Sequence, residues 1–368
     1  MAEQKVSDVD SCSPKLCDIC SRHGVHMKAV AECNECDMKY CGACIPEHRF
    51  LFMAGHKMEY IDGREGKPFP DLEKIPPFDF KDRQSIDTIV SLFQKNISFE
   101  EDTHTAYYVT DICISTFDDI RECYVTGCVA MDNKELLIAD KNNMKLKLFD
   151  SNGSIITAAD TPHVPWGITK VNQKSVATCG SGSAVLIWEV KGGDISVLKS
   201  IQVHEMAFGI SNNTGLICTM HPHLDSLTFI GKPINAVINY RRFYDPNGKQ
   251  LNFGFDIEMD ELCAYVGCGL GDKRIIGISI PSLTIIWECP LLGNTCGVIE
   301  LRGQLVVADM TNKKIESVSK SGKWLQTLVS LEFMEGRPQY MACNISGRTL
   351  FVSQFGSDIV TVFGVRVS

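Results

Sequence analysis

The stretch LIADKNNMKLKLFDSNG at residues 137–153 has a counterpart in VADMTNKKIESVSKSG at residues 307–322. Both run from an apolar segment ending in Ala-Asp, through a turn containing Asn, to a segment of alternating polar and apolar residues and a polar turn ending in Gly. Alternation with a period of two predicts β-strands, and Asn and Gly mark the turns between them. The recurrence indicates a repeated unit of antiparallel strands.

The repeat extends through the chain from about residue 104. Glycines at 127, 167, 209, 254 and 297 are 40 to 45 residues apart, and Tyr340 follows after 43 more. A period of 40–50 residues with four short strands per unit is typical of a β-propeller blade. We therefore expect a mainly β, six-bladed propeller over residues 104–368, since a β-sandwich gives no reason for this period.

The last unit, residues 338–368, has room for three strands only. The segment AYYVTDICI at residues 106–114 reads as a strand that belongs to no unit. We expect this strand to be the outer strand of the last blade, which would close the ring and remove its open edges. The units at 137–153 and 307–322 resemble NHL repeats, and this resemblance implies an NHL-like propeller.

A second pattern lies near the N-terminus, where three C-x-x-C pairs are followed by two histidines between residues 17 and 56. Eight such ligands suffice for two tetrahedral zinc ions. Three disulfides are the alternative, but the short C-x-x-C spacing favours a metal. With four protein ligands each, both Zn2+ ions would be structural.

The order of these ligands resembles the B-box zinc finger of the tripartite-motif (TRIM) family. The resemblance implies a cross-brace, although spacing alone leaves a sequential pairing open. The family pattern assigns Cys17, Cys20, Cys41 and Cys44 to one zinc ion, and Cys33, Cys36, His48 and His56 to the other. His48 would lie on a short helix at residues 42–51, and His23 and His26 are alternatives to His56.

The chain then divides into a disordered N-terminus (1–14), a B-box module (15–60), a linker (61–103) and the propeller (104–368). Within the linker, Ile86, Ile89, Val90 and Phe93 form one apolar face of a helix at residues 85–95. This helix is too short for a coiled coil, which the TRIM pattern usually has here. No RING-type pattern precedes Cys17, which is a second departure from the family.

Composition and charge limit the classes of function that the chain is expected to have. The formal net charge of −9 disfavours a general nucleic-acid binder. No secretory signal or membrane-spanning run is present, and 17 cysteines fit a reducing compartment. We expect a cytoplasmic protein without membrane association that is monomeric or associates weakly.

No catalytic motif is recognisable, so we expect no intrinsic enzyme activity. Cys179, in ATCGSGSA, fits a strand followed by a turn better than a nucleophile. Asp140 and Asp309 occupy equivalent positions in two units, where capping of Asx turns explains them.

The propeller is therefore expected to supply a binding face, made by connections between blades and by turns between the second and third strands of each blade. The candidate partner-binding residues there are Arg241, Arg242, Phe243, Tyr244, Trp166, His221, His223 and Phe355. Arginine and aromatic residues are common interface anchors. Histidines 163, 204, 221 and 223 fall in the same connections, either as exposed loop residues or as a further metal site.

Three functions follow from these features. The first is a zinc-binding interaction adaptor that holds a protein ligand on one face of the propeller. The second is substrate recognition in ubiquitin transfer, which the TRIM resemblance implies. The third is RNA binding, known for some NHL propellers, but acidic residues offset the basic residues of the expected face.

Overall fold

The chain divides into two units, residues 1–77 and 78–368. The computed structural model describes residues 104–131, 135–203, 205–222, 226–231, 237–243, 251, 253–268, 273–280, 282–291, 293–330, 336–344 and 346–367, together with 16, 29, 31–33, 38–40 and 58–60. Among these residues there is no α-helix, and none form a helix that could span a membrane.

The described part of the first unit is a three-stranded antiparallel sheet in the order β2-β1-β3. Its strands are β1 (Ala31–Cys33), β2 (Met38–Tyr40) and β3 (Met58–Tyr60). Of the expected zinc ligands, Cys33 ends β1. The other seven ligands, the predicted helices at 42–51 and 85–95 and the N-terminus 1–14 lie outside the described residues.

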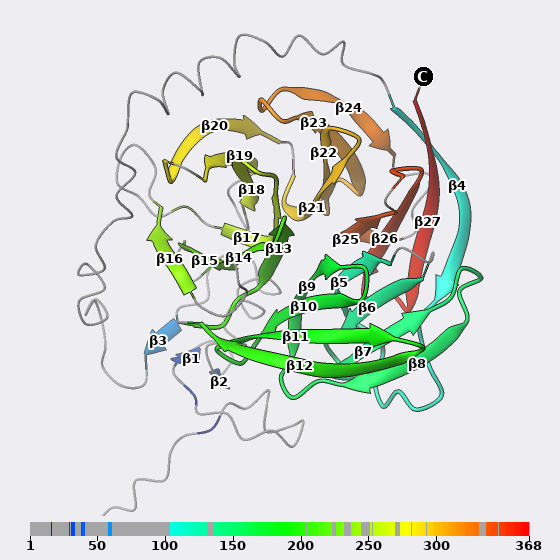
Figure 1. Ribbon diagram of the computed structural model, residues 1–368. Helices are drawn as coiled ribbons and strands as arrows, with labels where there is room; N and C mark the ends of the chain where they lie inside the picture. Colours follow the sequence, from blue (N-terminus) through cyan, green and yellow to red (C-terminus); the bar gives the residue numbers. More distant parts are fainter. Residues whose placement is uncertain are drawn as a thin grey trace, which may run out of the picture. The chain divides into compact units, whose positions relative to one another are not determined.

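The second unit is a ring of six four-stranded antiparallel sheets (Figure 1). This arrangement confirms the mainly β, six-bladed propeller expected from the repeat period. We number the blades from the sheet that contains β5. The first strand of each blade contacts the first strand of the next, and β25 contacts β5, so the ring is closed around a central channel.

The strands of blades 1 to 3 follow the sequence from the inner to the outer edge of each sheet. Blade 1 has β5 (Val125–Ala130), β6 (Leu136–Asp140), β7 (Lys145–Phe149) and β8 (Ile155–Asp160). Blade 2 has β9 (Pro165–Asn172), β10 (Ser175–Gly180), β11 (Ala184–Lys191) and β12 (Asp194–Gln202). Blade 3 has β13 (Gly209–Asn213), β14 (Leu216–His221), β15 (Ser226–Ile230) and β16 (Val237–Arg242).

Blades 4 and 5 repeat this order, and blade 6 departs from it. Blade 4 has β17 (Phe253–Met259), β18 (Cys263–Cys268), β19 (Arg274–Ser279) and β20 (Thr284–Pro290). Blade 5 has β21 (Thr295–Leu301), β22 (Gln304–Asp309), β23 (Lys314–Ser319) and β24 (Trp324–Val329). Blade 6 has β25 (Arg337–Cys343), β26 (Thr349–Phe355) and β27 (Ile359–Val367), with β4 (His104–Cys113) as its outermost strand.

The pairing of β4 with β27 joins the two ends of the propeller. The register runs from Cys113 opposite Ile359 to His104 opposite Val367. Figure 1 shows β4 lying along β27 at the outer edge of the ring. The first strand of the propeller in sequence thereby completes its last blade.

The repeated glycines lie where neighbouring inner strands approach most closely. A Cβ atom at Gly127 would lie 2.9 Å from Cγ2 of Ile168 in the next blade. At Gly167 it would lie 2.8 Å from the carbonyl oxygen of Phe208, and at Gly297 it would lie 2.6 Å from that of Gln339. The sequence period therefore marks contacts between blades rather than turns.

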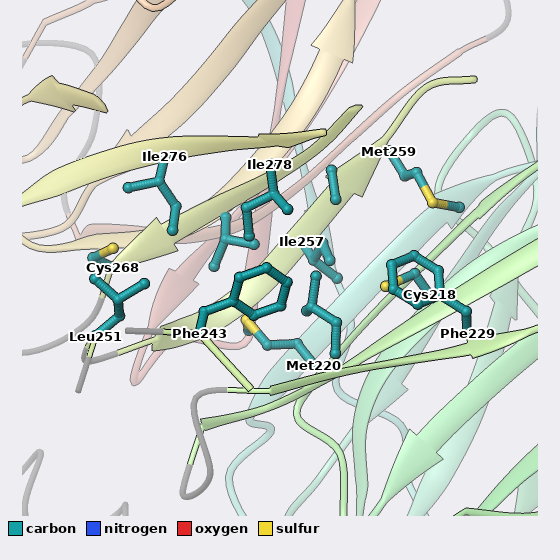
Figure 2. Close-up of a cluster of buried hydrophobic side chains, with 13 residues drawn as sticks. Cys218, Met220, Phe229, Phe243, Leu251, Ile257, Met259, Cys268, Ile276 and Ile278 are labelled. Atoms are coloured by element: carbon teal, nitrogen blue, oxygen red, sulfur yellow. The ribbon is translucent and has the colours of Figure 1, made fainter. Parts of the chain in front are cut away.

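Between the blades, side chains from the faces of adjacent sheets form separate apolar cores. Figure 2 shows the core between blades 3 and 4, where Met220 and Phe229 meet Ile257, Ile276 and other buried side chains. Burying each such side chain contributes about 1.5–3 kcal/mol. The stability of the ring thus comes from successive pairs of blades.

The close approach at Gly297 predicts a large cost for adding one methyl group. In Gly297→Ala, the new Cβ would meet backbone atoms of blade 6, which cannot move aside without shifting the strand. We expect the free energy of unfolding, measured by urea titration of the full chain, to fall by about 1–3 kcal/mol.

Gly303 supplies the matched control, since it is in a turn of the same blade with open space around it and a φ of 83°. Asn tolerates this conformation, so Gly303→Asn should cost no more than about 1 kcal/mol. Equal losses in the two variants would mean that the close approach does not constrain the fold.

Candidate functional site

The channel has two different ends. Inner strands begin at the end that carries the connections between blades, which we call the entry face. They finish at the opposite end, where a hairpin leads from each inner strand to the second strand of its blade. Those of the sequence-predicted binding residues that the structure describes lie in elements that meet the entry face.

An aromatic cluster lies on the entry face around the first residues of the inner strands. The Trp166 ring packs on Phe208 with ring centroids 4.6 Å apart, and Tyr124 meets Phe355 edge-on at 5.5 Å. The Lys141 ammonium group lies 4.2 Å from the Trp166 ring centroid and 5.0 Å from that of Tyr124. This cluster links blades 1, 2, 3 and 6, and it brings together two of the predicted binding residues, Trp166 and Phe355.

Three of the predicted residues are buried. Trp166 is 4% exposed, His221 is 1% exposed and Phe243 is 4% exposed. The Nδ1 atom of His221 lies 3.0 Å from the Met206 carbonyl oxygen, and its Nε2 atom lies 2.9 Å from the Thr228 hydroxyl. These side chains support the face from within rather than offer contact area.

The remaining predicted residues are only partly described. Arg241 and Arg242 lie in β16, opposite Leu227 and Ser226. Tyr244, His223 and His204 lie outside the described residues. Within the described part of the chain, no histidine belongs to a cluster of potential metal ligands.

Sequence reasoning missed the closing loop, residues 114–124, which joins β4 to β5 across the entry face. Two side chains of the neighbouring β6–β7 turn hold its backbone. The Asn143 Oδ1 atom accepts hydrogen bonds from the backbone N–H groups of Ile120 and Arg121, both at 3.1 Å. Asn142 Nδ2 donates to the Glu122 carbonyl oxygen at 3.0 Å. These hydrogen bonds tie the loop to the β6–β7 turn.

A network of buried charged side chains also holds the closing loop. Lys147, whose side chain is fully buried, lies 2.6 Å from Asp119 Oδ2 and 2.8 Å from Asp140 Oδ2. It also donates to the Ile114 carbonyl oxygen at 3.1 Å and to the Cys123 sulfur at 3.2 Å. Burial lowers the pKa of Lys147, but the two carboxylates outweigh that effect and raise it above its usual value.

This network explains the one cluster of potential metal ligands in the described residues, formed by Asp119, Cys123 and Asp140. The Lys147 ammonium group contacts all three side chains and supplies the positive charge that a metal would bring. Burial also raises the pKa of the Cys123 thiol, so the metal-binding thiolate is disfavoured. The cluster is a structural ion network.

The fixed loop exposes two large apolar side chains. Phe117 is 104% exposed and Ile120 is 92% exposed relative to a free residue. Between them lies Asp118, whose pKa is lowered to about 2 by a hydrogen bond from Lys145 at 2.6 Å. The segment TFDDIRE alone gives no signal for this exposure, because the anchoring side chains are 20 to 30 residues away.

A cavity of about 250 Å³ occupies the opposite part of the channel. Its walls come from the second halves of the inner strands, including residues 126–130, 167–170, 256–258, 298–300 and 340–343. The cavity therefore opens toward the end opposite to the entry face. Nothing in the repeat pattern separates these positions from other inner-strand positions.

Two carboxyl groups in β17, those of Asp256 and Glu258, line this cavity. Asp256 accepts hydrogen bonds from the backbone N–H groups of Ile257 and Val298, both at 3.0 Å. Glu258 accepts one from the N–H of Met259 at 3.2 Å. Burial raises the pKa of Asp256 to about 7 and that of Glu258 to about 8. Both groups thus titrate near neutral pH.

Comparisons with known proteins support the fold. No family model matches this sequence, and no curated protein matches it. Among solved structures, a chain of the hydrazine synthase of Kuenenia stuttgartiensis superposes with a TM-score of 0.52 at 9% sequence identity. The match covers 71% of this chain and 100% of that chain. At this identity the likeness concerns the fold alone.

The raised pKa of Glu258 predicts a specific dependence of stability on pH. Between its ordinary value of 4.5 and about 8, the folded protein keeps a proton that the unfolded chain releases. The wild-type free energy of unfolding should therefore fall as the pH rises through this window. The Glu258→Gln variant has no ionisable group at this position, so it lacks this loss of stability with rising pH. Its side-chain amide oxygen can still accept a hydrogen bond from the N–H of Met259.

The measurement is the difference in Tm between Glu258→Gln and the wild type at each pH. We expect this difference to grow in favour of the variant by about 3 °C or more from pH 5 to pH 8, and to level off above pH 8. Asp194→Asn, at an exposed position of β12, is the control and should show no such trend. A difference for Glu258→Gln that is flat across this range would contradict the buried, protonated carboxyl group.

Proposed function

We propose that this protein is an interaction adaptor whose propeller holds a protein ligand on the entry face. Propellers are commonly protein-interaction scaffolds. The observation that carries the proposal is the closing loop, which presents Phe117 and Ile120 almost fully exposed on a backbone fixed by its neighbours.

The energetics favour a binding role for this loop. Moving a Phe or Ile side chain from water into an apolar pocket of a partner contributes about 1.5–3 kcal/mol each. Because the loop is already ordered, binding would lose little conformational entropy. Side chains that fill a desolvated pocket of the partner contribute most of the binding free energy of a protein interface.

The surrounding face would extend the contact beyond the loop. Arg241 and Arg242 end β16 at the same face, Tyr244 and His223 are candidates from the sequence, and Phe355 is a partly exposed member of the aromatic cluster. Trp166, His221 and Phe243 would support these residues from inside. An apolar anchor with Asp118 and Glu122 beside it favours a partner pocket with a basic rim.

The same features disfavour RNA as the ligand. A surface for RNA combines basic groups for the phosphates with aromatic rings for stacking. The closing loop instead places exposed Asp118 and Glu122 beside its apolar side chains. Substrate recognition in ubiquitin transfer is compatible with the adaptor function and would require a partner that supplies the transfer activity.

We further propose that residues 15–60 form a B-box module that binds two structural zinc ions. The support is the β1–β2 hairpin. Cys33 lies at the end of β1, Cys36 lies in the connection to β2, and Cys41 directly follows β2. Cysteines in and beside a tight hairpin suit a tetrahedral thiolate site. When bound, the zinc ions would supply folding free energy and no chemistry of their own.

The adaptor proposal predicts that the closing loop is needed for capture of a protein ligand. We expect Phe117→Ser with Ile120→Ser to reduce recovery of specific protein partners, crosslinked in cells and identified by mass spectrometry, by about tenfold or more. A second variant, Arg242→Ala with Tyr244→Ala, should weaken the same partners.

The control is Ile156→Ser with Leu198→Ser, which removes two exposed apolar side chains from outer strands β8 and β12. This control should leave the partners unchanged. If wild type and the closing-loop variant recover the same partners in equal amounts, the closing loop is not the anchor. Recovery of RNA instead of protein would favour the third function.

The zinc proposal predicts two zinc ions per chain by elemental analysis of the purified protein. We expect Cys36→Ser to lower this content to one ion or fewer, because metal binding and folding are coupled there and loss of one site destabilises the module. Cys113→Ser, at an exposed free cysteine in β4, is the matched control and should retain both ions. A zinc-free wild-type protein would exclude the module.

A further inference from the structure

The cavity in the channel carries an inference that does not depend on the entry face. We propose that it binds an organic cation bearing alkylammonium groups, held between the carboxylates of Asp256 and Glu258. The cavity is large enough for a short aliphatic chain, with a volume of about 250 Å³. No side chain of the entry face is required.

The spacing of the two carboxyl groups determines the shape of the ligand. Asp256 and Glu258 are two residues apart on one strand, so their Cα atoms are about 7 Å apart, and both residues line the cavity. Among the described residues, neither belongs to a group of three or more potential metal ligands. A cation with two ammonium groups on a short chain can contact both carboxyl groups.

The lining offers further acceptors for ammonium N–H groups. The Oδ1 atom of Asn212 is buried and has no hydrogen-bond partner, although its Nδ2 atom donates to the Lys170 carbonyl oxygen at 2.9 Å. Glu258 Oε1 accepts hydrogen bonds from the Ser211 hydroxyl at 3.5 Å and from the Met259 N–H at 3.2 Å. An unpaired buried acceptor is costly to leave unsatisfied, and a bound ammonium group would satisfy it.

Acidic groups outnumber basic groups in the cavity lining, which favours a cationic ligand. Asp256, Glu258 and Glu300 are the acidic groups there, and Lys170 is the basic group. Lys320 pairs with Glu300 at 2.7 Å and with Asp260 at 3.1 Å. These two contacts leave the Asp256 and Glu258 carboxyl groups without a direct ion-pair partner among the described ion pairs.

The protonation behaviour agrees with this geometry. Burial raises the pKa of both carboxyl groups toward neutrality, and the charge of Lys320 only partly offsets this effect at Glu258. A bound ammonium group would supply further positive charge and favour ionisation. The walls between the polar groups are apolar, with Val129, Ile168, Ile210, Val298, Ile299 and Met341 available to pack against methylene groups.

The ammonium group can come from a free aliphatic diamine or from a lysine side chain of a peptide. Isothermal titration of the full chain at pH 7.5 with 1,4-diaminobutane tests the first source, and titration with Nα-acetyl-lysine amide tests the second. The neutral isostere 1,4-butanediol is the ligand control, because it has the same chain length without charge.

We expect saturable binding of at least one of the two amines and none of the diol. Asp256→Asn with Glu258→Gln should weaken that binding by about tenfold or more, while Asp194→Asn should leave it unchanged. Circular dichroism and a thermal melt of each variant confirm that it is folded. Glu258→Gln alone, which keeps the acceptor for Met259, is the second variant if the double variant unfolds.

Two results would overturn the proposal. One is the absence of binding by both amines up to millimolar concentration in the folded wild-type protein. The other is equal affinity of the wild type and a folded carboxyl variant, which would place the amine elsewhere. Neither result would affect the adaptor proposal, since the partners of the entry face are measured with variants of the closing loop.

Discussion

The propeller depends on the distance between neighbouring inner strands. Six strands converge on one channel, and at Gly127, Gly167 and Gly297 the backbone of the next blade, or a side chain held on it, occupies the space of a Cβ atom. Only glycine permits this approach, which in turn lets the faces of adjacent sheets meet and bury their apolar side chains. The blade-to-blade cores, such as that shown in Figure 2, follow from this contact.

Ring closure imposes the second constraint and brings the closing loop with it. Because β4 completes blade 6, the chain must cross from the outermost strand of that blade to the innermost strand of blade 1. The crossing is held by Asp358, which bonds to the N–H groups of Ile114 and Cys123, and by the buried Lys147 network. Removing one partner of such a network leaves an uncompensated buried charge. The rigidity of the loop is thus a consequence of closing the ring.

The sequence predicted the propeller because its constraints are periodic. The spacing of the glycines and the three-strand length of residues 338–368 indicated the number of blades and the need for an additional strand. The sites were less accessible to such reasoning. His221 and Trp166 read as exposed loop residues, yet the fold buries them. Phe117 is exposed because Asn142 and Asn143 lie beside its loop, and Asp256 lines a cavity because of its position along β17. These properties arise from contacts between distant residues, which no local pattern encodes.

The two ends of the channel differ in chemistry because they are built from different parts of each blade. The entry face is made of connections between blades, which can vary without disturbing the sheets. In this protein it carries the closing loop, with its two exposed apolar side chains, and the aromatic cluster. The cavity is lined by strand residues, whose side chains alternate between the two faces of their sheet, and its lining includes the carboxyl groups of Asp256 and Glu258. Large ligands are therefore suited to the entry face, and small charged groups are suited to the cavity.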